Sequence, residues 1–238
     1  MSGEKLKDRL LRIAAILSDG HGEDTVGKWS PVFEQYTVKG DVAFNRGDRF
    51  RENDFNAPVT DDLEKELNRR NIIVRQLAPE HLDIPLTVRR ERHHRIYKEL
   101  EGMGYLPITL SIHANGFGDG NSWNSVQGLE TFYKDGCRES FRLAELIQTN
   151  VMNVRRNYLP YTTRTNRGVK TANFFVFRNY EGIVVLPESE FMTNRQTLNL
   201  LCSNEYRAET VKAYADAIEE FQGFTTFGDL RHKTERRV

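Results

Sequence analysis

The sequence predicts one α/β domain built on a mostly parallel, twisted sheet of about six strands, with helices on both faces. Short apolar runs of strand length alternate along the chain with longer segments in which apolar residues recur every three or four positions. Several of the short runs are apolar at consecutive positions, which is typical of strands buried on both sides. The chain has 238 residues, of which 38% are hydrophobic and 11% aromatic, so we expect a single domain over residues 1–238.

The first third of the chain predicts a β-α-β unit. Residues 12–18 form an apolar strand, and the turn at 19–22 ends it. The segment 22–51 is rich in glycine, charges and scattered aromatic residues, which indicates a long ordered loop or a small hairpin. A helix over 53–69, with apolar residues four positions apart, then leads to a strand over 71–77.

The same alternation continues to the end of the sequence. A helix over 86–102 begins after Pro85, ends at glycines and leads to a strand over 106–112. The remaining expected elements are a strand over 127–134, a helix over about 138–154, strands over 171–177 and 182–187, and a helix over about 205–222.

Side chains with metal-binding or catalytic chemistry stand where expected strands end. His21, His113 and Glu188 each follow an apolar strand, and Glu52 stands at the start of the helix after the first strand. Ligands of α/β proteins bind at the carboxyl ends of the strands, so we expect these side chains to lie close together. Two imidazoles and one carboxylate can hold a zinc ion with a fourth position left for water, and a further carboxylate can accept the proton of that water.

The residues alone also permit a structural role for each of these side chains. A histidine at a strand end is often a hydrogen-bonding residue, and Glu52 can favour a helix N-terminus through its charge. Glu188 can be an ordinary loop carboxylate. The spacing of His21, Glu52 and His113 is no short metal-binding motif, so both interpretations stay open on the pattern alone.

Composition and charge limit the class of partner. The chain has 34 basic and 34 acidic residues, so no net charge favours a nucleic acid, and we expect none as a partner. No segment has the roughly 20 apolar residues of a membrane span, and no signal peptide is evident, so we expect synthesis in the cytoplasm and no membrane insertion. Cys137 and Cys202 lack paired spacing and are expected to be free thiols. The oligomeric state stays open.

The other histidines carry weaker patterns. His93 and His94 lie in a helix segment rich in arginine, and we interpret them as part of its solvated side rather than as metal ligands. His81 and His232 lie in polar surroundings with no partner pattern.

Several ordered segments together are distinctive of a known family. They are Asp19-Gly20-His21-Gly22, Ser111-Ile112-His113-Ala114-Asn115, Gly128 to Tyr133, Arg167 to Phe174, and Val185 to Asn194. In these segments, and over nearly its whole length, the chain resembles the type 3 class of zinc-dependent N-acetylmuramoyl-L-alanine amidases. Enzymes of this class occur in bacterial cell-wall remodelling and as phage endolysins.

The resemblance implies a zinc site and a catalytic base. His21, Glu52 and His113 would bind one zinc ion, and Glu188 would be the catalytic glutamate. Glu34 is the alternative third ligand, because it lies closer in sequence to the first histidine. We favour Glu52, because it opens the following helix as the ligand does in the family, and residues at about 32–50 then become a loop insertion.

The resemblance also implies the reaction and the partner. The reaction would be zinc-dependent hydrolysis of the amide between N-acetylmuramic acid and L-alanine in peptidoglycan, in cell lysis or wall remodelling. Arg167 and Asn115 are candidate substrate-binding residues, because a guanidinium can hold a stem-peptide carboxylate and Asn115 follows the second histidine. A surface turn for Arg167 and local backbone hydrogen bonds that stabilise the loop for Asn115 stay open as their alternatives. No separate wall-binding domain is expected. A non-catalytic wall-binding module and a zinc peptidase cutting another wall amide stay open as alternatives.

Glu190 adds a second carboxylate close in sequence to the expected base. It follows Glu188 by two positions, and residues two apart in an extended segment face the same side. If the two carboxylates approach closely, their repulsion would raise the pKa of one of them.

Overall fold

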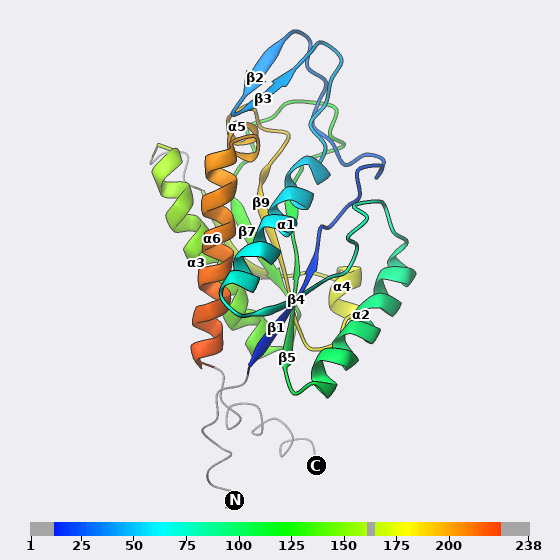
Figure 1. Ribbon diagram of the computed structural model, residues 1–238. Helices are drawn as coiled ribbons and strands as arrows, with labels where there is room; N and C mark the ends of the chain where they lie inside the picture. Colours follow the sequence, from blue (N-terminus) through cyan, green and yellow to red (C-terminus); the bar gives the residue numbers. More distant parts are fainter. Residues whose placement is uncertain (1–11, 161–164, 225–238) are drawn as a thin grey trace, which may run out of the picture.

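Figure 1 presents the computed structural model, which describes residues 12–160 and 165–224. A seven-stranded sheet crosses its centre in the order β4-β1-β5-β9-β7-β8, and the short strand β6 pairs with β9 beside this path. The strands of the sheet are β1 (Ile13–Ser18), β4 (Ile73–Gln76), β5 (Leu106–Ser111), β6 (His113–Asn115), β7 (Leu129–Tyr133), β8 (Asn166–Thr171) and β9 (Ile183–Phe191).

Most neighbouring strands run parallel. β1 pairs in parallel with both β4 and β5, and β5 pairs in parallel with β9. β7 runs antiparallel to β9 and parallel to β8, so β7 and β8 begin at the edge of the sheet where the other strands end. The predicted mostly parallel α/β sheet is therefore confirmed.

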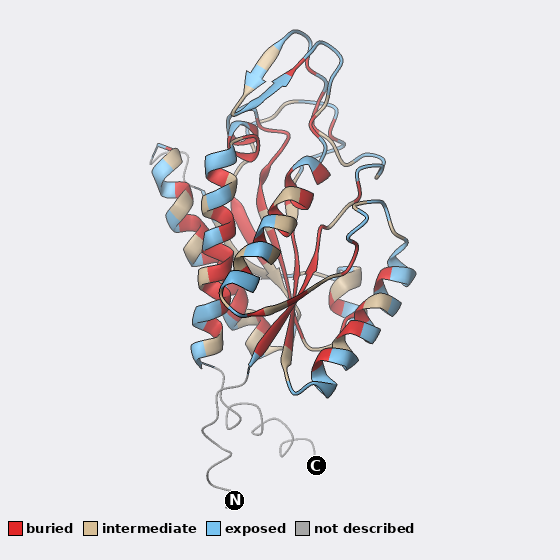
Figure 2. Cartoon of the chain, viewed as in Figure 1, coloured by how far each residue is buried: buried red, intermediate tan, exposed pale blue. Residues whose placement is uncertain are grey.

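Helices cover both faces of the sheet, as predicted. α1, α3 and α6 pack on one face, and α2 and α4 pack on the other (Figure 1). Figure 2 shows that the central strands and the inward sides of the helices are buried, whereas the outward sides of the helices are exposed. The helices are α1 (Asn53–Arg69), α2 (Leu86–Gly102), α3 (Arg138–Tyr158), α4 (Phe175–Asn179), α5 (Arg195–Leu201) and α6 (Asn204–Phe224).

The strand β1 illustrates why an apolar run suits this position. Ile13, Ala15 and Leu17 join the core on the side of α1, α3 and α6, whereas Ala14 and Ile16 join the core on the side of α2. Successive strand residues point to opposite faces, so a central strand covered on both faces is stable only if consecutive residues are apolar.

The segment between β1 and α1 contains a small hairpin. Its two antiparallel strands are β2 (Thr37–Lys39) and β3 (Val42–Phe44), which confirms one of the two expectations for residues 22–51. The hairpin projects beyond the edge of the sheet at which β1 ends (Figure 1). The ring of Phe44 stacks on that of Phe33 with centroids 4.3 Å apart, and both rings are buried in the core.

The strands expected over 12–18, 71–77, 106–112, 127–134 and 182–187 are present, with small shifts at their ends. The last of them extends further than predicted, because β9 continues to Phe191 and includes Glu188 itself. Cys137 and Cys202 are free thiols, as predicted. In the part of the chain that the structure describes, no helix is both long and apolar enough to cross a membrane.

The predicted strand over 171–177 is wrong. After β8 the chain forms the short helix α4, in which Phe177 packs into the core, and the ring of Phe174 contacts Phe132 with centroids 5.0 Å apart. A short apolar run has no periodicity that distinguishes a strand from a buried helical turn. β6 and α5 were not predicted, because three and seven residues are too few for a pattern.

Candidate metal centre

The turn after β1 places the first imidazole. Gly20 has a φ of +45°, which glycine adopts more readily than other residues. A Cβ at this position would lie 2.5 Å from the ring of His113, so only a residue without a side chain lets the turn approach that histidine. The rings of His21 and His113 consequently meet edge to face, with centroids 5.1 Å apart.

The strands β5 and β6 place the second imidazole. His113 begins β6, where its backbone lies opposite Glu188 of β9. Its Nδ1 lies 2.8 Å from Glu52 Oε1, and its Nε2 lies 3.1 Å from Ser111 Oγ. Both ring nitrogens therefore have a polar neighbour that fixes the ring orientation.

Glu52 completes a cluster of three ligand-type side chains. It precedes the first residue of α1, and its side chain is 2% exposed. Its Oε2 lies 3.8 Å from His21 Nε2 and 3.8 Å from Lys28 Nζ. One ligand atom from each of His21, Glu52 and His113 lies within 4.8 Å of the other two. Glu34, the alternative ligand, is exposed before the hairpin and is not part of this cluster.

The protonation states of this cluster suit a divalent cation. Burial lowers the pKa of His21 to about 3, so its imidazole is neutral at pH 7. Burial alone would raise the pKa of Glu52, but the hydrogen bond and the charge of His113 outweigh it and lower the pKa to about 2. Zinc binds neutral imidazole and ionised carboxylate, so the states of His21 and Glu52 fit that ion.

Glu188 lies beside this cluster on the central strand β9. Its backbone pairs with His113 on one side and with Glu130 of β7 on the other. Its Oε2 is enclosed and has no hydrogen-bond partner among the described residues. Burial raises the pKa of Glu188 well above its usual range, and the negative charge of Glu52 raises it further. The position holds a basic carboxylate with a free lone pair.

Two cavities meet at Glu188. One, of about 230 Å³, also borders His21 and His113, and the other, of about 110 Å³, also borders Glu52. The first has an apolar wall formed by Leu86, Phe174, Phe175 and Val176. The second is lined mainly by polar residues and by Gly116, Gly118 and Gly120. A substrate whose reacting bond lies next to Glu188 would thus have space on both sides of that bond.

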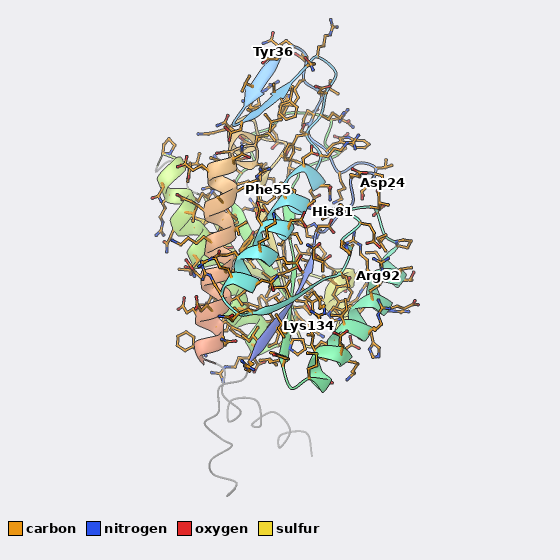
Figure 3. The ribbon with its side chains drawn as sticks, viewed as in Figure 1. Asp24, Tyr36, Phe55, His81, Arg92 and Lys134 are labelled. Atoms are coloured by element: carbon orange, nitrogen blue, oxygen red, sulfur yellow. The ribbon has the colours of Figure 1, made fainter. Side chains whose placement is uncertain are left out.

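A polar network that sequence reasoning missed supports the turn that carries His21. Asn53 of α1 donates from Nδ2 to the His21 carbonyl oxygen at 2.6 Å and lies 3.5 Å from Asp19 Oδ2. The Nδ1 of His81, a residue labelled in Figure 3, lies 2.8 Å from the same Asp19 oxygen. The sequence pattern indicated no partner for His81, and the structure identifies Asp19 as one. No local pattern could reveal the pair, because 62 positions separate the two residues.

The two candidate substrate-binding residues meet on one carboxylate. Asn115 Nδ2 donates to Glu130 Oε1 at 2.7 Å, and Asn115 Oδ1 accepts the backbone N–H of Gly116 at 2.8 Å. Arg167 Nε donates to Glu130 Oε2 at 3.0 Å. Glu130 was not singled out from the sequence, since its role depends on strands that are far apart along the chain.

Glu190 does not face Glu188. The register between β6 and β9 shifts after Glu188, so a bulge interrupts the alternation of side chains on β9. Glu190 is fully buried, forms an ion pair with Arg155 of α3 and lies 3.5 Å from the Tyr206 hydroxyl of α6. The expectation that the two carboxylates share one side is wrong. Burial, rather than repulsion by Glu188, raises the pKa of Glu190.

The interpretation of His93 as a solvated residue is also wrong. Its side chain is fully buried, stacks on Tyr180 with centroids 4.1 Å apart and lies 2.9 Å from Thr109 Oγ1. Its neighbour His94 is exposed, as predicted. His232 lies outside the described residues.

A comparison of the sequence with family profiles identifies the family. Residues 16–220 match the profile of the family described as N-acetylmuramoyl-L-alanine amidase, Amidase_3. Over 111 residues the chain is 35% identical to N-acetylmuramoyl-L-alanine amidase LytC of Bacillus subtilis strain 168. This similarity covers 46% of the chain and only 20% of the length of LytC.

Solved structures of amidases share the fold. AmiC2 of Nostoc punctiforme, an N-acetylmuramoyl-L-alanine amidase, superposes with a TM-score of 0.66 at 22% identity, covering 89% of this chain and 97% of that one. An N-acetylmuramoyl-L-alanine amidase from Clostridium difficile 630 superposes with a TM-score of 0.64 at 19% identity, covering 91% and 100%. The profile match extends over most of the sequence, and the chain therefore belongs to the N-acetylmuramoyl-L-alanine amidase family Amidase_3.

Proposed function

We propose that this chain hydrolyses the amide between N-acetylmuramic acid and L-alanine of peptidoglycan, with one zinc ion bound by His21, Glu52 and His113. The main support is the convergence of these three side chains at one edge of the sheet in a chain of the amidase family. The reaction would take place at the bacterial cell wall, in cell lysis or in wall remodelling.

The residues of the cluster would hold the ion and leave space for the substrate. A zinc ion held by three protein ligands would supply a Lewis acid that polarises the scissile carbonyl and makes water more acidic. Ser111 lies beside Nε2 of His113 and would orient that ring while Nδ1 binds the ion, and Asn53 fixes the backbone of His21. Polar partners of this kind orient ligands and increase metal affinity.

Glu188 would move the proton. Its Oε2 has no hydrogen-bond partner within the described residues, and Glu188 lines both cavities. In the proposed reaction the carboxylate accepts a proton from the attacking water and then donates it to the leaving alanine nitrogen. The raised pKa makes Glu188 a stronger base than an exposed glutamate.

The test is digestion of purified peptidoglycan by Glu188→Gln, which keeps the shape of the side chain and removes the base. We expect the rate of stem-peptide release to fall by at least about a hundredfold, the usual effect of losing general-base catalysis. The matched control is Glu91→Gln, the same change at an exposed position of α2, which should digest like the unmodified chain. Undiminished release by Glu188→Gln would reject the proposed role.

Mass analysis of the products separates the proposed reaction from its alternatives. Amidase activity frees stem peptides that begin with L-alanine and leaves the glycan strands intact. Cut cross-links would identify a peptidase acting on another wall amide, and binding to the wall without any cleavage would identify a non-catalytic module. A metal chelator should abolish release, and added zinc should restore it.

A further inference from the structure

The Glu130 carboxylate binds two cationic side chains next to the proposed base. Its Oε2 accepts hydrogen bonds from Arg167 Nε and from Lys170 Nζ, while its Oε1 accepts from Asn115. The Glu130 side chain is 6% exposed. Burial opposes its ionisation, but the hydrogen bonds from Lys170 and Arg167 outweigh burial and lower its pKa. Glu130 is therefore an ionised carboxylate with both oxygens occupied.

The sheet register fixes the place of these cations. Glu130 of β7 lies directly opposite Glu188 of β9, and Gly168 of β8 lies opposite Glu130. Neighbouring strands are about 4.8 Å apart, so the backbone of β8 lies roughly 10 Å from that of β9. Arg167 and Lys170 extend from β8 back toward Glu130, on the side of Glu188 that is away from the two histidines.

The cluster carries unused positive charge. Arg167 and Lys170 together bring two positive charges against the single negative charge of Glu130. Their side chains are 33% and 37% exposed, so both can be reached from solvent. Arg167 donates to Glu130 only through Nε, and its two terminal nitrogens have no acceptor among the described residues. Its guanidinium lies 5.2 Å from the ring centroid of Phe191. Such a guanidinium can still bind a carboxylate through those nitrogens.

We propose that Arg167 and Lys170 form a subsite for the carboxylate that the stem peptide carries one residue beyond the cleaved amide, with Glu130 as the positioning residue. The inference rests on the proposed function and adds the orientation of the substrate. The peptide extends across β9 toward β7 and β8, and the sugar lies on the opposite side of Glu188.

The chemistry of the substrate supports this orientation. The only carboxyl group of N-acetylmuramic acid is consumed in the amide, so the sugar side of the bond offers no negative charge to two cations. A carboxylate on the residue after L-alanine lies about 4–7 Å from the cleaved bond, one to two residue lengths along the chain. The long side chains of Arg167 and Lys170 span the remaining distance from β8.

The subsite predicts a preference between two soluble substrates. The substrates are muramyl tripeptides whose second residue, linked through its side-chain carboxyl, bears either a free α-carboxylate or an α-carboxamide. For the unmodified chain we expect kcat/KM to be about tenfold higher on the carboxylate substrate, mainly through a lower KM, because a charge-assisted hydrogen bond is lost with the amide.

Variants assign the preference to the cluster. Lys170→Met and Arg167→Met should each bring the ratio of kcat/KM on the two substrates toward one. Lys170→Arg keeps the charge and should keep most of the preference. The matched control is Lys98→Met, on the exposed side of α2, which should keep the full preference.

The outcomes distinguish this inference from the proposed function. Equal cleavage of both substrates by the unmodified chain would overturn the subsite while supporting the amidase activity, and it requires no variant to fold. A preference that survives in both methionine variants would also overturn it. Failure to cleave either substrate at the lactyl amide, in a preparation loaded with zinc, would overturn the proposed function and the subsite together.

Discussion

At the scale of single residues, Gly20 sets how closely the two histidines approach. Gly20→Ala would require an alanine at a φ of +45° and would place its Cβ 2.5 Å from the His113 ring. We expect zinc affinity to fall by at least about tenfold, because displacing a ligand ring has effects at least as large as the loss of its supporting partner. Competition with a zinc-binding dye measures the change.

The control for this prediction separates backbone strain from the steric clash. Gly136 has a φ of +68° and open space around its missing Cβ, so Gly136→Ala introduces similar strain far from the histidines. We expect it to cost about 1 kcal/mol of stability and to leave zinc affinity unchanged. Equal zinc affinities of the two variants would contradict the role of Gly20.

The sequence predicted which side chains gather at the candidate site better than it predicted their surroundings. His21, His113 and Glu188 could be predicted, because the ends of neighbouring parallel strands meet at one edge of the sheet. The buried partners Asp19 and His81 could not be paired, because their contact depends on how the loop after β4 folds back. The direction of Glu190 was wrong for a similar reason, since a bulge on β9 cannot be recognised from the sequence.

At the scale of the elements, the buried ion pair between Arg155 and Glu190 connects α3 to β9. Both side chains are fully buried. We expect Arg155→Met to lower the free energy of unfolding by about 3–5 kcal/mol, because it leaves an unneutralised carboxylate in the core. Urea denaturation measures the loss. For comparison, Arg92 on α2 (Figure 3) forms an ion pair near the surface with Glu80, which precedes that helix. Arg92→Met removes this pair and should lower the free energy of unfolding by less than about 1 kcal/mol.

A double variant completes this test. Combining Arg155→Met with Glu190→Gln removes the buried charge together with its partner. The combined loss should be smaller than the sum of the two single losses, since each single variant leaves the other group buried without its counter-charge. If the losses in free energy of unfolding of the two single variants add up to that of the double variant, Arg155 and Glu190 do not stabilise the contact of α3 with β9 by interacting with each other.

Elements in which apolar residues recur at a clear period were predicted, and short elements without such a period were not. The long helices α1 and α2 have apolar residues at helical spacing and clear end signals, so their bounds match the sequence expectation. The aromatic run at 174–177 is apolar at most positions, which suits a strand as well as the buried turn of α4 that it forms. Tertiary packing against the sheet decides between the two.

At the scale of the whole molecule, His93 links stability to pH. Burial lowers its pKa in the folded chain to about 4 from a usual value of 6.5. As the pH falls, the unfolded chain therefore takes up the proton first, and this residue's contribution to stability is lost between about pH 6.5 and pH 4. The loss is on the order of 3 kcal/mol.

His93→Phe removes this contribution, together with the contact between His93 Nδ1 and Glu181 Oε2 at 3.2 Å. The variant keeps an aromatic ring beside Tyr180 and cannot take up a proton. We expect it to be less stable than the unmodified chain at pH 7, because Thr109 loses its partner, but to lose less stability on acidification to pH 4. Denaturation curves at both pH values give the free energy of unfolding. If it falls by the same amount from pH 7 to pH 4 in the variant and in the unmodified chain, the assignment to His93 is contradicted.

The whole fold serves to bring distant segments to one edge of a rigid sheet. The first histidine comes from the turn after β1, the carboxylate from the start of α1, and the second histidine from β6. Because these residues are far apart along the chain, no short motif identifies the site. The resemblance to a family was therefore needed to favour a zinc site over a structural role for these residues.

The central claim is that His21, Glu52 and His113 hold one zinc ion, and zinc content after exhaustive dialysis tests it most directly. The unmodified chain and Glu34→Gln should each retain about one zinc per chain, as a site with three protein ligands requires. Glu52→Gln should lose most of it. Retention of zinc by Glu52→Gln together with its loss from Glu34→Gln would contradict the account.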